Sequence, residues 1–270
     1  MFSFKLSKYE AINSLKMFFW WWLALAGTGL LFASVFNSLK SQSNDLDKVM
    51  QALNPQILQA FNISPSGYLN TVESFLSGQF ASVFSLSGAI LSIIIGVGLI
   101  GAKIENKTIV FWLSKNISRL GLYFTKFLTQ SLVFTLANLL IAICMYFSFY
   151  FLSNQKEISK QYFIVLFLAC NSLFVTMLSF GMFLGLIFNR SKAQAIGISI
   201  VALSWVLNAL STLGDYPNWA KYISVFYFLD LTQIRDKYEI DPYKLLILGA
   251  VSIVFLIAGI LIFRRKNIYA

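Results

Sequence analysis

The residues best suited to do chemistry in this chain lie between two long apolar stretches, flanked on both sides by basic residues. Ile109, Trp112 and Leu113 fall on one stripe of a helix of about two turns. Phe111 lies beside that stripe, and Thr108 is expected to cap its first turn. Aromatic side chains and arginine carry much of the energy of protein–protein interfaces. The run therefore predicts a docking site for a soluble protein, although it also fits a helix resting on lipid headgroups.

Other kinds of chemistry are disfavoured by what the apolar stretches lack. Six stretches contain no Asp, Glu, Lys or Arg, and the chain has no His. A charge in hydrocarbon costs about 3 kcal/mol, so proteins that keep one usually use it to move protons or ions. Intramembrane hydrolysis needs paired carboxylates, a metal or an activated nucleophile. We therefore expect no catalytic residue, no ion coupling and no metal site, with Cys144 and Cys170 acting as small apolar residues.

Each of the six stretches approaches or exceeds the roughly 20 residues that cross a bilayer as a helix. Because lipid tolerates only helices or closed barrels, the sequence predicts an all-α membrane protein with six transmembrane helices. A hydrophobic content of 58% excludes an ordinary soluble domain. The predicted spans are residues 17–36, 80–102, 127–152, 162–188, 193–213 and 245–263.

The distribution of charge predicts the orientation. With both termini in the cytoplasm, the net charge of +10 divides into +11 on the inner segments and −1 on the outer ones. Basic residues concentrate on the cytoplasmic side of membrane proteins, which favours this topology in the cell membrane. Since the positive charge follows the membrane topology, it does not indicate a nucleic-acid partner.

Four connecting segments have patterns of their own. Residues 1–16 predict an amphipathic helix in the inner interface, where basic and apolar residues separate onto two faces. Residues 37–79 predict an outer loop with short helices, and residues 103–126 form the cytoplasmic segment that holds the docking run. Residues 214–244 are rich in aromatic residues but too short to span, which is typical of a re-entrant or interfacial segment.

A polar and small stripe runs along the fifth stretch at intervals of three to four residues or multiples of these. Its members are Gln194, Gly197, Ser204, Asn208 and Ser211. Since polar groups are unfavourable against lipid, we expect the stripe to face a conduit or a second permease, with ordinary packing as the alternative. A conduit lined by Ser, Asn, Gln and Phe would suit an amphipathic substrate such as a peptide, a lipid-like molecule or an antibiotic.

Ladders of small residues occur in two other stretches. The second contains Ser85, Gly88, Ser92 and Gly96, and the fourth contains Gly181 and Gly185. Small residues four apart let helix backbones approach closely in membranes. We interpret both ladders as helix-packing surfaces.

The segment from Gly101 to Lys126 resembles the cytoplasmic motif of permease subunits of ATP-binding-cassette transporters of the type-2 class. That motif runs roughly E-x-x-x-G-T-L-E-x-L-L-S-x-P-I-S-R, with a later Gly-Lys. Lys107 and Asn116 depart from it, standing where the family usually has glycine and proline. The residues that match are Glu105, Thr108, Leu113, Ser114, Ile117, Ser118, Arg119 and Lys126. Residues 64–69, 224–228 and 263–268 also resemble the family, so the resemblance covers the whole chain as one permease domain, residues 1–270.

The resemblance implies that the chain is not itself an enzyme. ATP and Mg would be bound by a separate cytoplasmic ATPase, since no G-x-x-x-x-G-K-[ST] occurs here. Two permeases, identical or paired, would assemble with two ATPase subunits and export the substrate. The alternative is a membrane scaffold or sensor that docks a cytoplasmic protein without transport. The coupling residues implied are Glu105, Thr108, Phe111, Trp112, Leu113, Ser114 and Arg119.

Overall fold

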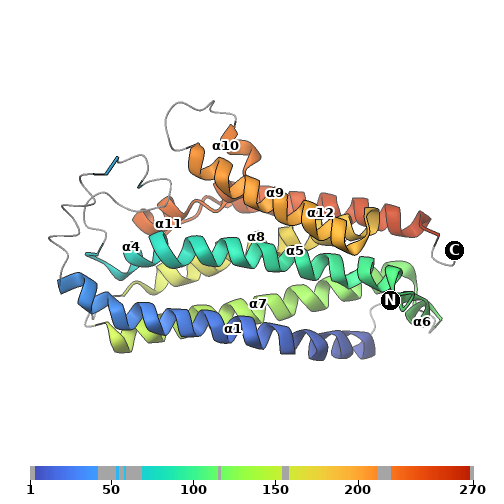
Figure 1. The fold of residues 1–270 in the computed structure, drawn as a ribbon, viewed down its shortest axis with the longest axis horizontal. Helices are drawn as coiled ribbons and strands as arrows, with labels where there is room; N and C mark the ends of the chain where they lie inside the picture. Colours follow the sequence, from blue (N-terminus) through green and yellow to red (C-terminus); the bar gives the residue numbers. More distant parts are fainter. Residues whose placement is uncertain are drawn as a thin grey trace.

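The computed structural model describes residues 4–41, 53–54, 58, 69–114, 117–153, 158–211 and 220–267. These residues form long helices packed side by side in an elongated bundle, with no strand among them (Figure 1). The α-helices are α1 (Phe4–Ser41), α4 (Val72–Leu76), α5 (Ser82–Glu105), α6 (Ile109–Leu113), α7 (Arg119–Leu152), α8 (Lys160–Ile187), α9 (Arg190–Leu210), α10 (Ala220–Ile223), α11 (Leu231–Lys237) and α12 (Pro242–Arg265). A π-helix, η1 (Ser77–Ala81), joins α4 to α5, and a 3-10 helix, η2 (Val225–Phe228), precedes α11.

The expected six spans are confirmed by the length and apolar character of six helical segments. These are 18–41, 72–105, 119–152, 160–187, 190–210 and 242–265. Both ends of the chain lie at the same end of the bundle as α6, and α4 and α11 lie at the other (Figure 1). We call these the α6 end and the α11 end. An even number of crossings returns the chain to its starting side, as the predicted topology requires.

The helices extend beyond the predicted boundaries. Residues 4–41 form one helix, so the structure does not separate an amphipathic helix at 1–16 from the first span. Both ends of the predicted outer segment 37–79 are helical in the structure, because α1 continues to Ser41 and helix begins again at Val72. Most of its remaining residues lie outside the described part of the chain. A helix continues as long as neighbouring helices pack against it. The hydropathy of the sequence does not record such packing, so it predicts shorter helices.

Four of the long helices begin at side-chain caps that the sequence supplies. Ser118 accepts a hydrogen bond from the Gly121 backbone N–H at 3.1 Å, which starts α7. Ser159, Asn189 and Asp241 act in the same way at the starts of α8, α9 and α12. Each cap satisfies one of the N–H groups that a first helical turn leaves without an intrahelical acceptor.

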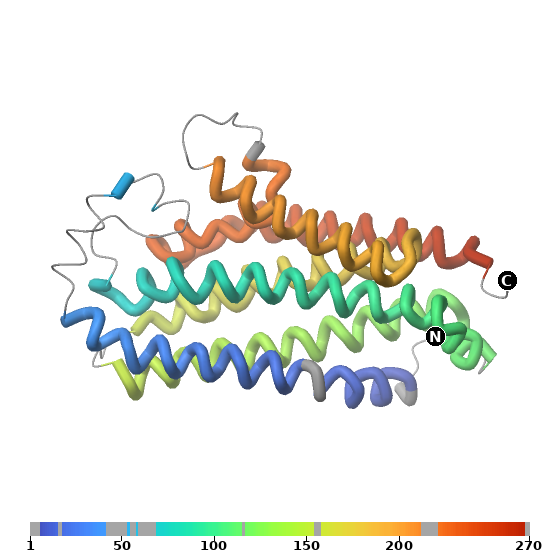
Figure 2. Tube along the Cα trace, viewed as in Figure 1, coloured from blue at the N-terminus to red at the C-terminus, as the bar shows by residue number. Residues whose placement is uncertain are grey.

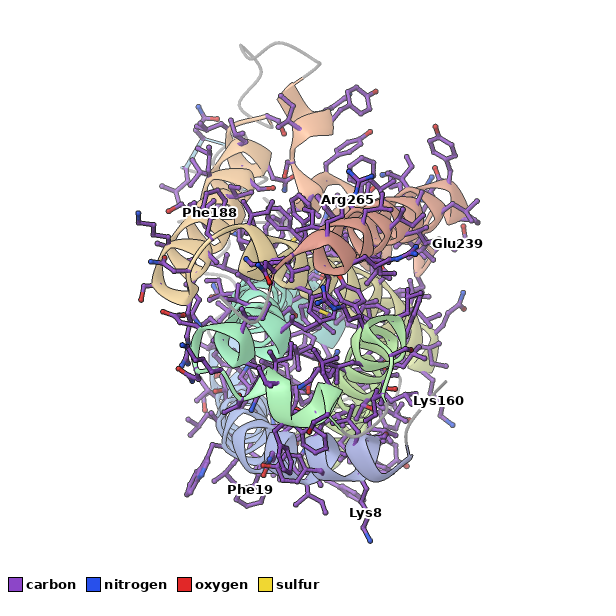
Figure 3. The ribbon with its side chains drawn as sticks, turned by 90° about the vertical axis from the view of Figure 1, so that its right-hand side faces the viewer. Lys8, Phe19, Lys160, Phe188, Glu239 and Arg265 are labelled. Carbon is purple, nitrogen blue, oxygen red and sulfur yellow. The ribbon has the colours of Figure 1, made fainter. Side chains whose placement is uncertain are left out.

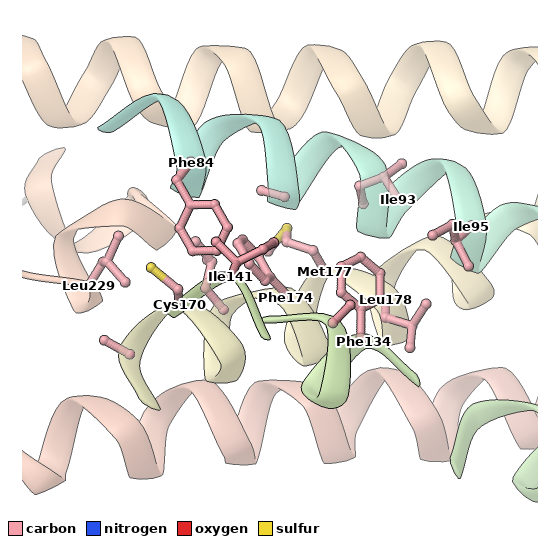
Figure 4. Close-up of a cluster of buried hydrophobic side chains, with 14 of the residues drawn as sticks. Phe84, Ile93, Ile95, Phe134, Ile141, Cys170, Phe174, Met177, Leu178 and Leu229 are labelled. Atoms are coloured by element: carbon pink, nitrogen blue, oxygen red, sulfur yellow. The ribbon is translucent and has the colours of Figure 1, made fainter. Parts of the chain in front are cut away.

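Helices α5 and α8 form the centre of the bundle. Their most apolar windows are 61% buried, against 22% for those of α1, α9 and α12. Figure 4 shows Phe84 and Ile93 from α5 converging with Phe174 and Met177 from α8, joined by Phe134 from α7. The ring of Phe84 meets that of Phe174 edge to face, with centroids 5.4 Å apart. Such aromatic pairs add to the packing that holds these three helices together.

Glycines set how closely α5 and α8 approach. A Cβ atom built at Gly96 would lie 2.4 Å from the carbonyl oxygen of Leu178, and one at Gly101 would lie 2.4 Å from that of Gly185. A Cβ atom built at Gly181 would lie 2.7 Å from the carbonyl oxygen of Ile93. These distances are shorter than any side chain tolerates, so the interpretation of the ladders as packing surfaces is confirmed.

Polar contacts join the first turns of α1 to the start of α7. The Lys126 ammonium donates to Glu10 Oε1 at 2.5 Å, and both residues are buried. Beside this ion pair, the Thr129 hydroxyl bonds that of Ser7 at 2.8 Å. Lys126 was expected in a connecting segment, but it lies within α7, because that helix starts eight residues earlier than predicted and the buried carboxylate neutralises the charge.

Substitution of Gly96 by Ala should destabilise the bundle by about 2 kcal/mol, because the added methyl group meets the α8 backbone, which has no rotamer to yield. Gly98→Ala is the matched control, since a Cβ there meets nothing within 4 Å. The measurement is the thermal unfolding midpoint of each purified variant in one detergent. Equal midpoints for Gly96→Ala and Gly98→Ala would contradict the close approach of α5 and α8.

The Glu10–Lys126 pair should show strong coupling in a double-mutant cycle. Glu10→Leu or Lys126→Met alone leaves a buried charge without its partner and should cost about 3 kcal/mol. The double variant should recover most of that loss, because two apolar side chains replace two charges. Asp236→Asn is the control, since the Arg235–Asp236 pair is half-exposed and such pairs contribute little. Simple additivity of the two single losses, measured by unfolding in detergent, would argue against the pairing.

Candidate functional site

The segment that holds α6 turns back at one end of the bundle, between α5 and α7 (Figure 2). Ile109 is completely buried and anchors the helix, whereas the Phe111 side chain is 57% exposed. Leu113 is half-buried and Ser114 is exposed. The short helix therefore fixes one apolar side chain in the bundle and presents another to the surroundings.

Trp112 and Phe111 have different environments, which the sequence pattern did not separate. The Trp112 ring lies 5.5 Å from that of Tyr9 in α1, at an interplanar angle of 50°. Phe111 stands edge-on to Trp112, with ring centroids 5.6 Å apart. Both aromatic residues were expected to be exposed for docking. The structure instead places Trp112 between Phe111 and α1, and Tyr9 is a neighbour that sequence reasoning missed because it lies 103 positions away.

Thr108 does not cap α6, which corrects the expectation from sequence. Its backbone is already helical, at φ −72° and ψ −15°, whereas a capping side chain needs an extended backbone. Its hydroxyl donates instead to the Lys103 carbonyl at 3.3 Å, near the end of α5. The hydroxyl of Ser114 donates back to the Phe111 carbonyl at 2.8 Å. Both hydroxyls therefore bond carbonyls that a helix end leaves unpaired.

Lys107 has φ 57°, in the left-handed region that glycine enters without cost. This is the position where the related motif usually has glycine. The chain keeps the left-handed conformation with lysine, at a cost of about 1 kcal/mol. The turn between α5 and α6 is thus held by the contacts around it. Asn116, the other departure, lies outside the described residues.

Glu105 and Arg119 attach the two sides of this segment to other helices. Glu105 Oε2 accepts the backbone N–H of Arg190 at 3.1 Å, in the first turn of α9. Arg119 Nη1 donates to the carbonyls of Phe263, Arg264 and Lys266, at 2.8 to 3.1 Å, where α12 ends. A carboxylate at a helix N-terminus and a guanidinium at a C-terminus both oppose the helix dipole favourably. Displacement of this segment therefore disturbs the ends of α9 and α12.

The surroundings of α6 are basic. Lys8 of α1 points away from the bundle in the view onto this end (Figure 3), and Arg264 and Arg265 are exposed beside the end of α12. Lys266 is engaged inward, since its ammonium donates to the Leu186 carbonyl at the end of α8 at 2.5 Å. An exposed phenylalanine with cationic neighbours fits an acidic or polar groove of a partner better than a small-molecule substrate.

The polar stripe of the fifth span divides into two environments. A Cβ on Gly197 would lie 2.5 Å from Ile93 Cγ2, so this glycine packs against α5. The hydroxyl of Ser204 accepts the Val225 backbone N–H at 2.8 Å and is buried. These contacts account for Gly197 and Ser204 by packing within the chain. Whether the stripe faces a conduit or a second permease stays a prediction.

The other members of the stripe are more accessible. Gln194 is half-buried in the first turns of α9, at the α6 end. Asn208 and Ser211 line a cavity of about 240 Å³ at the α11 end. The sequence did not predict this cavity, because its walls come from segments more than 100 residues apart. In the sequence, the feature that marked the region of this cavity was the aromatic cluster in residues 214–244.

A comparison with protein-family models matches residues 15–268 to the family described as ABC-2 family transporter protein. A comparison with curated proteins finds no match. The family match covers all six spans and the α6 segment, on which the resemblance in sequence was first seen. With six apolar helices and a match over nearly its whole length, the chain belongs to the ABC-2 family of transporter proteins, as a multi-pass permease subunit of a type-2 ATP-binding-cassette transporter.

Proposed function

We propose that this permease is driven by a separate cytoplasmic ATPase subunit, which docks on α6, and that it exports an amphipathic substrate from the cell. The observation that carries the proposal is Phe111, an exposed aromatic side chain on a helix whose flanks are bonded to α9 and α12. The excess of +11 on the inner segments supports a cytoplasmic position for α6.

We assign ATP hydrolysis and substrate movement to different subunits. The sequence has no phosphate-binding loop, so ATP and Mg are assigned to the partner. The permease contributes no catalytic group and converts nucleotide-driven movement of its partner into movement of its helices. Among the described residues, the buried ion pair Glu10–Lys126 lies near the α6 end and is mutually neutralised, which does not favour a role as an ion carrier.

A second permease, identical or related, completes the proposed transporter. Helices α1, α9 and α12 leave most of their apolar surface uncovered within one chain. Lipid and a second permease are the partners that fit such surfaces in the cell membrane. The amphipathic substrate is supported by the mixture of hydroxyl, amide and aromatic groups where α9 ends.

Phe111 is the residue expected to enter the ATPase groove. Phe111→Ala should lower co-purification of the ATPase by about tenfold, which corresponds to the 1.4 kcal/mol or more that a buried aromatic contributes to an interface. Tyr243→Ala is the matched control, because Tyr243 is 67% exposed at the start of α12, at the other end of the bundle. The measurement is affinity capture of tagged permease from cells that express both subunits. Undiminished capture by Phe111→Ala would remove α6 as the docking site.

Trp112 is expected to transmit movement, since its ring connects α6 to Tyr9 of α1. Trp112→Ala should leave the permease inserted and bound to the ATPase, while ATP hydrolysis by the complex loses its stimulation by amphipathic peptides or antibiotics. The ATPase rate of purified complexes in lipid vesicles, with and without these compounds, measures this. Full stimulation of ATP hydrolysis in the Trp112→Ala complex would contradict a role of Trp112 in transmitting movement. If none of these compounds stimulates ATP hydrolysis by the unsubstituted complex, the result would count against an amphipathic substrate.

A further inference from the structure

We infer that the cavity at the α11 end binds the anionic headgroup of an amphipathic molecule. Its walls come from the first turn of α5, the last turns of α9, and the segment that runs from α10 through η2 to α11. The polar lining residues are Ser82, Ser85, Asn208, Ser211, Lys221, Asp230 and Thr232. The inference deepens the proposed function if the amphiphile is the exported substrate, but the site itself does not depend on the ATPase.

The volume of the cavity decides which part of a ligand it takes. Sites that enclose a whole drug-sized molecule have volumes of roughly 300–1,000 Å³. At about 240 Å³, this cavity accommodates a headgroup. Trp205, Phe226 and Leu229 form an apolar wall on which the rest of the molecule can lie. Headgroup recognition with an apolar remainder is the signature of an amphiphile.

The charge of the cavity selects the sign of the headgroup. Asp230 is fully engaged, because one carboxylate oxygen pairs with the Lys244 ammonium and the other accepts the Gln233 backbone N–H at 3.1 Å. Lys221, by contrast, forms no ion pair with any residue that the structure describes. Its ammonium lies 5.2 Å and 5.8 Å from the ring centroids of Tyr222 and Tyr227, which hold it at the wall. One uncompensated positive charge therefore remains for an anion.

Asn208 is the lining residue that offers further donors to an anion in this cavity. The Asn208 side chain makes no hydrogen bond within the described part of the chain, so its amide N–H groups are available as donors. The hydroxyls of Ser82 and Ser85 donate to helix carbonyls and form the floor. This floor follows directly on η1, and π-helical turns are frequent beside binding sites.

The other large grooves of the described structure lack these features. Two grooves of about 590 Å³ each follow the seam between α1 and α7, from Leu15 to Leu152. Their linings are almost wholly apolar, and no charged residue is among them. They suit hydrocarbon chains of the bilayer but offer no selection of a headgroup. The cavity at the α11 end is thus the better recognition site.

The test measures binding of dodecyl phosphate to the purified full-length permease, without ATPase, by calorimetry in a neutral detergent. Lys221→Gln should weaken binding at least tenfold, whereas Lys237→Gln, an exposed lysine of α11 outside the cavity, should leave it unchanged. Dodecyltrimethylammonium, with the same tail and opposite charge, should not compete. Asn208→Leu removes the amide donors with little change in side-chain shape and should also weaken binding while the unfolding midpoint is retained. Equal affinity of the Lys221→Gln and unsubstituted proteins, or equal binding of the cationic amphiphile, overturns the inference.

Two further measurements identify the source of the headgroup. If the ligand is an exported substrate, dodecyl phosphate stimulates ATP hydrolysis by the complex, and Lys221→Gln abolishes the stimulation. If it is a phospholipid of the outer leaflet, Lys221→Gln lowers the phosphatidylglycerol that co-purifies, and hydrolysis does not respond. Either result supports the site. Because binding is measured on the permease alone, failure of ATPase docking at α6 would remove the proposed function and leave this inference standing.

Discussion

The contact between the backbones of α5 and α8 determines where the other helices can lie. Gly96 and Gly101 on one helix meet carbonyl groups of the other with no room for a side chain. In a bilayer the lipid tails are as apolar as the helices, so such close packing supplies much of the attraction between them. The fixed pair then provides surfaces for α7, α9 and α12. The α6 segment is positioned by this pair, because it is the continuation of α5.

The second organising feature is the pairing of helix ends with side chains of opposite charge. Arg119 covers the carbonyls that close α12, Lys266 one that closes α8, and Glu105 an N–H that opens α9. In water such contacts are weak, but here they join helices whose other contacts are mainly apolar. Two basic residues at the α6 end, Arg119 and Lys266, thus join helix ends. Arg119 lies at the start of α7 and binds the end of α12, so it joins these two helices next to the α6 segment.

The sequence predicted what depends on composition and missed what depends on distant contacts. Six spans and the packing of the glycine ladders follow from hydropathy and spacing, which are local properties. The burial of Lys126 was not predictable, since it requires Glu10 of another helix to lie beside it. The same holds for Trp112 and Tyr9. Spacing along the fifth span grouped Gly197 with Asn208, but Ile93 of α5 packs against the first, whereas the second lines a cavity together with Ser82 and Ser85.

Two helices connect the α6 segment with the cavity at the other end of the bundle. Helix α5 begins at Ser82, on the cavity floor, and ends at Glu105, next to the turn that leads into α6. Helix α9 begins where Glu105 bonds it and carries Asn208 at its far end. Its 21 residues span about 31 Å, and a helix of that length moves as a unit. A shift of α6 that changes the angle between α5 and α9 must therefore change the cavity between their opposite ends. Reciprocally, a ligand that holds Ser85 and Asn208 at a fixed separation resists that shift, so binding at the cavity and displacement of α6 are thermodynamically coupled.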